Sequence, residues 1–215
     1  LLKNQVKYID LAVVTHLHDD HYLGIVELAK KMKIQKLGIY EANRLQEQMI
    51  MADTGLRKQN LLYLAKGDRI EVEKGIYLDV LYPEKQSDET YRTFLMDEHD
   101  ENESSLLIKL DYHGLTVLLT GDIGLEGEQK IMNVYRERES VLNVDILKVA
   151  HHGSRYSTGD RFLDIASPNI AVFQVGKNNF GHPHPTIIDK CLEKDIIVYR
   201  NDQDGAVILN EKGEK

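Results

Sequence analysis

The sequence predicts an α/β fold with mixed β-sheets. Two observations support this class: short apolar, β-branched runs alternate with amphipathic segments along the chain, and hairpin signals occur among them. A chain of 215 residues can bury one large core, and its four prolines leave no Pro-rich spacer between two halves. We therefore expect a single domain over residues 1–215.

The first hundred residues alternate between strand and helix patterns. Strands are expected at residues 8–15, 36–40 and, in two pieces, 68–83, and helices at 23–32 and 41–53. Gly55 would close the second of these helices, and the dipeptide Lys74-Gly75 marks the turn between the two later strands. The polar, acidic stretch 86–102 has no clear period, so we expect a long loop there.

The second half continues this alternation after one hairpin. The hairpin is expected at residues 105–112 and 115–120, with its turn at His113-Gly114. Helices are expected at 124–138, 160–166 and 185–194, and strands at 144–150, 169–175, 196–200 and 206–209. Pro185 suits the first position of its helix, because the N–H of that position has no partner inside the helix.

The composition is that of a globular protein, with 42% hydrophobic and 29% charged residues. A net charge of -8 excludes a broad basic surface for nucleic acid, although not a local basic groove. The single cysteine, Cys191, cannot form an internal disulfide and is expected to be a small buried residue rather than a catalytic thiol. No apolar run reaches the length that spans a bilayer, and the sequence leaves localisation and oligomeric state open.

Potential metal ligands are concentrated in THLHDDHYLG, directly after the first apolar strand. His16 and His18 are two residues apart and therefore point the same way on an extended segment. Asp20 and His21 follow where the chain turns into a helix. Imidazoles and a carboxylate form a donor set that suits zinc, so we expect a metal site. The alternative is that Asp19 or Asp20 merely caps the helix.

Three further motifs place polar groups at strand ends. Asp122 follows the apolar run in LTVLLTGD, as a metal-bridging carboxylate or as a helix cap. In LKVAHHGS, two adjacent histidines cannot both easily face one metal, so one of His151 and His152 would be a ligand and the other would support it or face substrate. In FGHPHP, prolines flank and stiffen the segment around His184, which suits a substrate contact or a structural turn.

Together these motifs resemble the metallo-β-lactamase superfamily, and more closely the late-competence, DNA-uptake (ComEC-like) hydrolase domain and related bacterial phosphoesterases. The resemblance is carried by THLHDDHYLG, ENESSL, LLTGD, LKVAHHGS, GKNNFGHPHP and YRNDQDGAV, from about residue 9 to residue 208. It implies an αββα four-layer sandwich of two mixed sheets. It also implies an N-terminal hairpin ending in an Asp-x-Gly turn, which nothing before Leu1 supplies, so we expect a truncated domain or a segment located elsewhere.

The same resemblance implies a site for two divalent metal ions along one edge of the sandwich. The implied ligands are His16 and His18 for one ion, Asp20, His21 and an HHGS histidine for the other, and Asp122 as the bridge. Of the two HHGS histidines, His151 is preferred over His152 as the ligand. Zinc is favoured, while manganese or iron would be tolerated.

One ligand position of the superfamily is not matched. Many members have a further histidine between the first motif and the bridging aspartate, for which His99 and His113 are the candidates here, with His113 at the wrong end of its strand. In the branch that this chain resembles, the ENxxS element takes that place, and Asn102 would contribute an oxygen or hold a water. We therefore expect one metal site to be weaker than the other.

The resemblance also implies a hydrolase in which a water between the two metals acts as hydroxide. Asp20 or Asp122 would orient that water, and His184 or His182 would donate to the developing oxyanion. Substrate contacts are expected from His152, Ser154, Lys177, His182, Asn102 and Ser105. The expected substrate is a phosphodiester or phosphoester, small or polymeric, with nucleic acid as one option. Two alternatives stay open: a thioester or lactone hydrolase of the same fold, and a non-catalytic metal-binding module.

Overall fold

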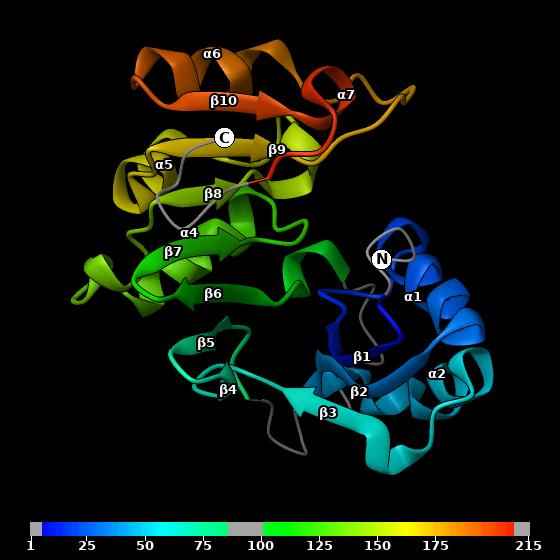
Figure 1. Cartoon of the computed structure of the whole chain (residues 1–215). Coiled ribbons are helices and arrows are strands. Elements are labelled where there is room, and N and C mark those ends of the chain that lie inside the picture. Colours follow the sequence, from blue (N-terminus) through cyan, green and yellow to red (C-terminus); the bar gives the residue numbers. More distant parts are fainter. Residues whose placement is uncertain (1–5, 86–100, 209–215) are drawn as a thin grey trace.

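The computed structural model describes residues 6–85 and 101–208, so His99 and most of the expected loop lie outside the described part. Two β-sheets pack face to face, with helices on their outer sides (Figure 1). A buried cluster between the sheets joins Tyr40 of the smaller sheet to Val80 and Ile108 of the larger one. This layering confirms the expected αββα sandwich.

The smaller sheet has the strand order β1-β2-β3. Its strands are β1 (Tyr8–Val13), β2 (Lys33–Tyr40) and β3 (Leu61–Leu64), and both pairs are parallel. Within the described residues this sheet is therefore not mixed as expected, because helical crossovers connect its strands in the same direction. The sequence did not predict β3, because LLYL is a run of four residues without polar alternation or a clear turn signal on both sides.

The larger sheet has seven strands in the order β10-β9-β8-β7-β6-β5-β4. They are β4 (Arg69–Glu73), β5 (Ile76–Tyr82), β6 (Leu107–Tyr112), β7 (Leu115–Leu119), β8 (Ile146–Lys148), β9 (Ile170–Phe173) and β10 (Ile197–Arg200). Pairing is antiparallel from β4 to β7 and parallel from β7 to β10, so this sheet is mixed as expected. The β6–β7 hairpin turns at His113 and Gly114, both with positive φ.

Helices flank both sheets. They are α1 (Asp19–Lys31), α2 (Glu47–Thr54), α4 (Leu125–Val134), α5 (Asp160–Ala166), α6 (Pro185–Glu193) and α7 (Asn201–Asp204). Short 3₁₀ turns occur at η2 (Glu41–Gln46), η3 (Lys58–Asn60), η4 (Glu101–Ser104), η5 (Glu139–Val141) and η6 (Ala150–Gly153). Within the described ranges, no helix combines the length and the apolar character needed to cross a membrane.

Helix boundaries differ from the expectation in three places, one of which is α4: it was expected to reach residue 138 but ends at Val134, and the chain then turns. Helix α1 begins at Asp19, and both Asp19 and Asp20 lie in its first turn, where the helix dipole favours carboxylates. Its N-cap is His18, so neither aspartate takes the capping role considered from the sequence. The expected helix at 41–53 divides into η2 and α2, and Gly55 closes α2 in the left-handed conformation as predicted.

The expected strand at 206–209 is wrong for residues 206–208, which have no strand pairing. The backbone N–H of Arg200, the last residue of β10, donates to Asp204 at 2.8 Å, and its guanidinium pairs with Asp202 at 2.7 Å. These bonds fold the chain into α7, which takes it away from the sheet. Residue 209 lies outside the described part.

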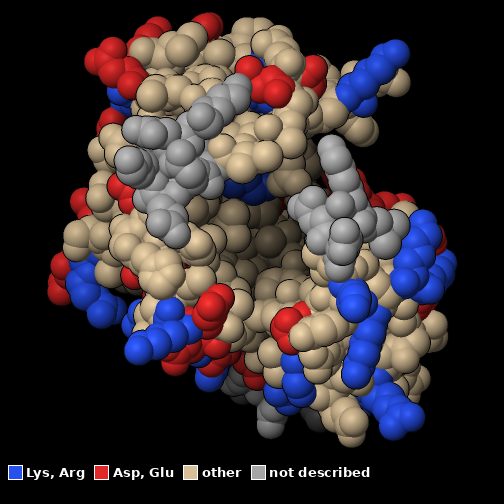
Figure 2. Space-filling view, in the orientation of Figure 1, with Lys and Arg blue, Asp and Glu red and all other residues tan. Residues whose placement is uncertain are grey.

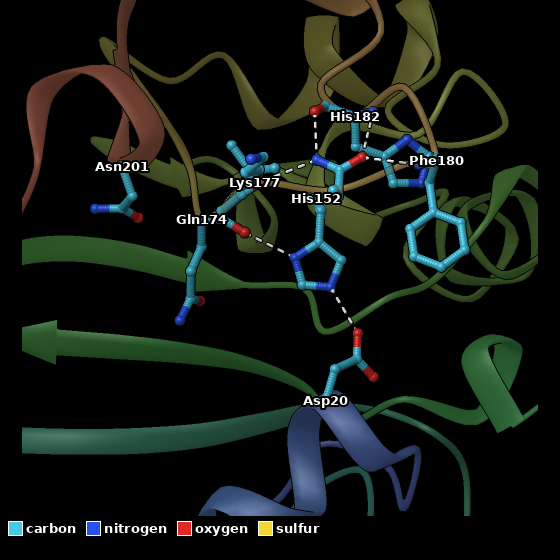
Figure 3. Close-up of a pocket in the computed structure, with 10 residues that line it drawn as sticks. Asp20, His152, Gln174, Lys177, Phe180, His182 and Asn201 are labelled. Carbon is cyan, nitrogen blue, oxygen red and sulfur yellow. Dashed lines mark hydrogen bonds and ion pairs between the residues drawn. The ribbon is translucent and has the colours of Figure 1, made fainter.

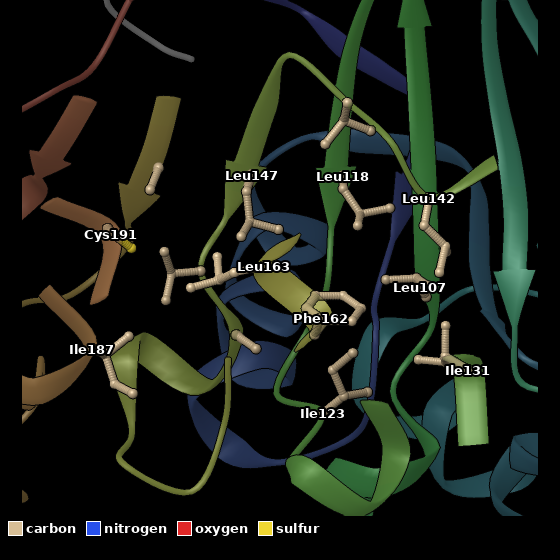
Figure 4. Packing of buried hydrophobic residues seen from close by; sticks show 14 of the residues in the cluster. Leu107, Leu118, Ile123, Ile131, Leu142, Leu147, Phe162, Leu163, Ile187 and Cys191 are labelled. Atoms are coloured by element: carbon tan, nitrogen blue, oxygen red, sulfur yellow. The ribbon is translucent and has the colours of Figure 1, made fainter. Parts of the chain in front are cut away.

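The larger core fills the space between the seven-stranded sheet and helices α4, α5 and α6. Figure 4 shows Leu107 and Leu118 of the sheet close to Ile131 of α4 and Phe162 of α5. Cys191 of α6 belongs to the same cluster and has no exposed surface, which raises its pKa to about 11. The expectation of a small buried cysteine is confirmed.

A buried carboxylate on α4 should make stability depend on pH. Glu128 accepts the backbone N–H groups of Thr158 and Gly159, and burial nevertheless raises its pKa from 4.5 to about 7. Between these two values the folded chain keeps a proton that the unfolded chain has released. Stability should therefore fall as the pH rises through this range, by up to about 3 kcal/mol at roughly 1.4 kcal/mol per pKa unit.

We expect Glu128→Gln to remove this pH dependence, because glutamine has no proton to lose. Urea denaturation would measure the unfolding free energy of both proteins between about pH 5 and pH 8. As the pH rises, the value for the variant should increase relative to that of the wild type. Glu126→Gln, a change on the exposed side of the same helix, is the control. A difference between wild type and Glu128→Gln that stays constant across this range would contradict the prediction.

Candidate metal centre

The expected site residues gather at one edge of the sandwich, where parallel strands have their carboxyl ends (Figure 1). Residues 15–21 follow β1, Asp122 follows β7, and the HHGS motif follows β8. Strand β6 runs antiparallel to β7, so Ser105, just before β6, lies at the same edge. The carboxyl ends of the strands are the usual place for ligands in α/β sheets.

Four side chains converge at this edge. Asp20, His21, Asp122 and His152 each offer one donor atom, and these atoms all lie within 4.8 Å of one another. Asp122 is 2% exposed, and its two carboxylate oxygens lie 3.2 Å from Nε2 of His152 and 3.2 Å from Nε2 of His21. Asp20 Oδ2 lies 3.3 Å from His152 Nε2. Two imidazoles and two carboxylates at such distances indicate a site for a divalent metal.

Neighbouring oxygens orient the imidazole rings. Nδ1 of His152 lies 2.7 Å from the carbonyl oxygen of Gln174. Because a carbonyl can only accept, Nδ1 carries a proton, and Nε2 faces Asp122, where it can bind a metal in place of a proton. Thr15 Oγ1 lies 3.2 Å from Nδ1 of His16 and 3.4 Å from Nδ1 of His21. Metal-ligating histidines are commonly oriented by partners of this kind.

His16 shows most directly that the site fits a metal. The residue is 3% exposed, yet among the described residues its Nε2 has no hydrogen-bond partner. Its Nδ1 lies 3.2 Å from Ser105 Oγ, which also accepts the backbone N–H of Asp122 at 3.1 Å. Burial, followed by the neighbouring His21, lowers the pKa of His16 to about 3. The ring is therefore neutral, the form that binds metals.

Asp122 is held in its ionised form. Burial opposes ionisation, but hydrogen bonds from His152 and His21, helped by the charge of Lys148, keep the pKa of Asp122 well below its usual range. Lys148 Nζ lies 3.7 Å from Asp122 Oδ1 and donates to the carbonyl of Gly121 at 2.9 Å. Asp122 is thus an anionic donor at the centre of the cluster.

The geometry of the HHGS turn favours His152 over His151. Both histidines have positive φ, 47° for His151 and 53° for His152, a conformation that non-glycine residues seldom adopt. A Cβ at Gly153, where φ is 84°, would lie 2.7 Å from Pro183, so only glycine fits there. His152 Nε2 lies 3.2 Å from Asp122 and His151 Nε2 lies 3.9 Å away. His152, and not the preferred His151, is therefore the histidine of this motif that belongs to the four-residue cluster.

His16 and His18 lie beside the four-residue cluster rather than in it. The ring centroid of His16 is 4.1 Å from that of His21 and 4.8 Å from that of His18. His18 is partly exposed, and its Nε2 lies 4.0 Å from Oε2 of Glu101 in η4. The structure thus brings the residues of the first motif together with the ENxxS element.

Two of the residues expected to contact substrate are largely buried. Ser105 has no exposed surface, and its hydroxyl contacts His16 and the backbone N–H of Asp122. Ser154 is 3% exposed and accepts the N–H of Tyr156 at 3.3 Å, and it lines a second pocket together with His151 and His182. Asn102, another of the expected substrate contacts, is half-buried in η4, where its backbone carbonyl accepts the N–H of Ser105 at 3.0 Å.

The two histidines of the GHPHP segment have different environments. His184 is the N-cap of α6, and its Nδ1 accepts the N–H of Thr186 at 3.3 Å. Nδ1 of His184 therefore has a structural role as a helix cap, which was one of the two alternatives that the sequence left open. His182 lines the same pocket as His152, and both His182 and His184 line a second pocket.

A pocket of about 580 Å³ opens beside the cluster (Figure 3). It is lined by Asp20, His152, Gln174, Val175, Gly176, Lys177, Asn178, Phe180, His182 and Asn201. Figure 2 shows the surface hollowed between the larger sheet and α1, on the side of these loops. Lys177, which the sequence analysis named as a candidate substrate contact, thus lines this pocket.

Sequence reasoning missed three contributors: Thr15, Gln174 and Phe180. A weak signal existed for Thr15, which directly precedes the His-x-His pair. Gln174 acts through its backbone carbonyl, which leaves no trace in the residue type. Phe180 stands in the quoted GKNNFGHPHP motif, but an aromatic residue alone does not distinguish a binding surface from a core position.

The model of the metallo-beta-lactamase superfamily matches residues 1–177. ComE operon protein 3 of Bacillus subtilis is 31% identical over 208 residues, which cover 94% of this chain and 24% of that protein. Competence protein ComA of Neisseria gonorrhoeae is 30% identical over 109 residues, which cover 50% of this chain and 15% of that protein. The chain thus spans about a quarter or less of the length of these curated relatives.

Two solved structures share the fold, each with 16% identity and a TM-score of 0.54. One is a proposed metal-dependent hydrolase from Parabacteroides distasonis, with 91% of this chain and 77% of that chain covered. The other is an isothiocyanate hydrolase from Delia radicum gut bacteria, with 94% and 76% covered. The family match and the converging ligands support a metal-dependent hydrolase that binds divalent metal. The chain belongs to the metallo-beta-lactamase superfamily, and its relatives include competence proteins.

Proposed function

We propose that the chain is a phosphodiesterase that works with two divalent metal ions. The observation that carries the proposal is the convergence of two carboxylates and two imidazoles at the strand ends, next to a buried His16 whose Nε2 has no hydrogen-bond partner among the described residues. A single ion would use the four-residue cluster and leave the adjacent His16 and His18 without a role. Two ions account for both groups.

The proposed ligands are Asp20, His21 and His152 for one ion, His16 and His18 for the other, and Asp122 for both. Glu101 is our candidate for the position where many superfamily members have a further histidine, because its Oε2 lies 4.0 Å from His18 Nε2. Nitrogen and oxygen donors of this kind favour zinc and would accept manganese or iron.

The divalent ions would acidify a water and offset charge on the leaving oxygen. Asp20 is the most exposed of the clustered groups, so it can orient an incoming water by accepting its proton. His182 lines the pocket next to His152 and can donate to a phosphate oxygen. The contacts of Asp122 with His152, His21 and Lys148 keep its carboxylate ionised.

A phosphodiester suits the pocket because positive charge and an amide group lie on its wall opposite the carboxylate of Asp20. Lys177 provides an ammonium, and the side chain of Gln174 has an amide donor. The names of the competence relatives are consistent with nucleic acid as the natural substrate. The net charge of -8 favours a local contact with a short single strand over a long duplex.

The test is hydrolysis of bis(p-nitrophenyl) phosphate by protein loaded with zinc, manganese or iron, beside a thioester and a lactone. We expect turnover of the phosphodiester with at least one metal, its loss on chelation and its return when the metal is restored. Turnover of only the thioester or the lactone would contradict the substrate class. Absence of turnover with every substrate would favour a non-catalytic metal-binding module.

Ser105→Ala is expected to weaken metal binding by about ten- to 100-fold. The change removes the hydroxyl that contacts His16 Nδ1 and accepts the N–H of Asp122. Competition with a chromogenic chelator would measure the affinity, with the exposed Ser140→Ala as control. An affinity equal to that of the wild type would show that Ser105 does not position the ligands.

A further inference from the structure

Phe180 is the most exposed large apolar side chain in the described part of the protein, with 83% of its surface in contact with solvent. Single exposed apolar residues are common on protein surfaces, so exposure alone says little. Phe180 differs because it lines the pocket beside the metal centre, together with Asp20 and His152 (Figure 3).

The loop holds Phe180 firmly in this place. Asn178 Oδ1 accepts the backbone N–H of Phe180 at 3.0 Å and that of His182 at 3.1 Å. The amide group of Asn178 donates to the carbonyls of Gly176 at 2.9 Å and His182 at 2.8 Å. Gly181 completes the turn with a φ of 77°. The side chain of Asn178 thus bonds the backbone on both sides of Phe180, which fixes the position of this residue in the loop.

Phe180 also separates two pockets. It lines the pocket of about 580 Å³ that contains Lys177, and a second pocket of about 430 Å³ that contains Arg155 and Tyr156. Its ring is nearly parallel to that of His182, at 25° and a centroid distance of 6.0 Å. A ligand that reaches from one pocket to the other therefore crosses an aromatic ring that has a cation on either side.

We propose that Phe180 is a stacking platform for a nucleobase of a single-stranded nucleic acid whose phosphodiester lies at the metal centre. The proposal rests on the phosphodiesterase function proposed above. Single strands alternate flat bases with phosphates, and proteins bind them with aromatic rings flanked by positive charge, the arrangement of Phe180 between Lys177 and Arg155. A duplex hides its base faces inside the stack, and a quaternary ammonium would be repelled by the same two cations.

The test compares Phe180→Leu and Phe180→Tyr with the wild type, all loaded with metal. Fluorescence anisotropy would measure binding of a short phosphorothioate strand, which resists hydrolysis, and of a strand of equal length and charge without bases. We expect Phe180→Leu to weaken binding of the intact strand by about tenfold and to leave binding of the baseless strand unchanged. Phe180→Tyr, which keeps a flat ring, should restore the wild-type affinity.

Tyr112→Leu is the matched control, because Tyr112 is a partly exposed aromatic residue away from the candidate metal centre. It ends β6, whereas Ser105, at the metal centre, precedes β6. Equal binding of the intact strand by wild type and Phe180→Leu would overturn the platform, as would an equal loss for both strands. Competition by phosphorylcholine as strong as that by the strand would also overturn it. Binding is read without turnover, so base-dependent binding by an inactive protein would contradict only the phosphodiesterase proposal.

Discussion

Asp122→Asn should reduce phosphodiester hydrolysis by a factor of about 10³ or more, which corresponds to roughly 4 kcal/mol of lost transition-state stabilisation. Asp122 is the anionic group at the middle of the site, 3.2 Å from both His21 and His152. Asparagine keeps the shape of the side chain but has no charge to share between two ions. The turnover rate, measured by steady-state kinetics, and the metal content should therefore both decrease.

Asp195→Asn is a suitable control, because Asp195 is exposed and has a φ of 58°, a conformation that asparagine tolerates well. Thermal unfolding of Asp122→Asn should remain cooperative, since Lys148 keeps its hydrogen bond to the Gly121 carbonyl. An Asp122→Asn enzyme with wild-type turnover and full metal content would remove Asp122 from the centre of the mechanism.

His152→Asn is expected to lose most activity and about one equivalent of metal, whereas His151→Asn should keep both equivalents. His152 lies closer to Asp122 than His151 does, and the Gln174 carbonyl fixes its Nδ1–H. Asparagine is chosen for both positions because it tolerates the positive φ that these residues adopt, so that the turn itself is preserved.

Elemental analysis and calorimetric zinc titration of the two variants would check this difference. The opposite result, with metal lost from His151→Asn and retained by His152→Asn, would return the ligand role to His151. Equal losses in both variants would show that the change disturbs the turn rather than one ligand. Asp195→Asn, at an exposed position with a similar φ of 58°, supplies a control for backbone effects.

Much of the fold follows from local patterns. The runs 8–15 and 144–150 contain β1 and β8, and the expected hairpin contains β6 and β7, because buried strands need continuous or alternating apolar residues. The short strand β3 has too few residues to show a period. The end of β10 at Arg200 was predicted correctly, whereas the expected strand at 206–208 was wrong because contacts of Arg200 with Asp202 and Asp204, which depend on the fold, lead the chain into α7.

The candidate site shows a similar division. Residue types and their positions after strands identify the groups that converge, including Asp20, His21 and Asp122. The choice between His151 and His152 could not be made from the sequence, because it depends on two consecutive residues with positive φ. Burial decides the role of Ser105, and burial depends on neighbours that are distant along the chain.

The central claim is a site for two divalent metal ions, and the most direct test is the metal content of protein purified without chelator or added metal. We predict about two equivalents of zinc, manganese or iron per chain, or uptake to two equivalents on titration, because two groups of donors flank Asp122. A protein that binds none, and takes up none on titration, would contradict the account.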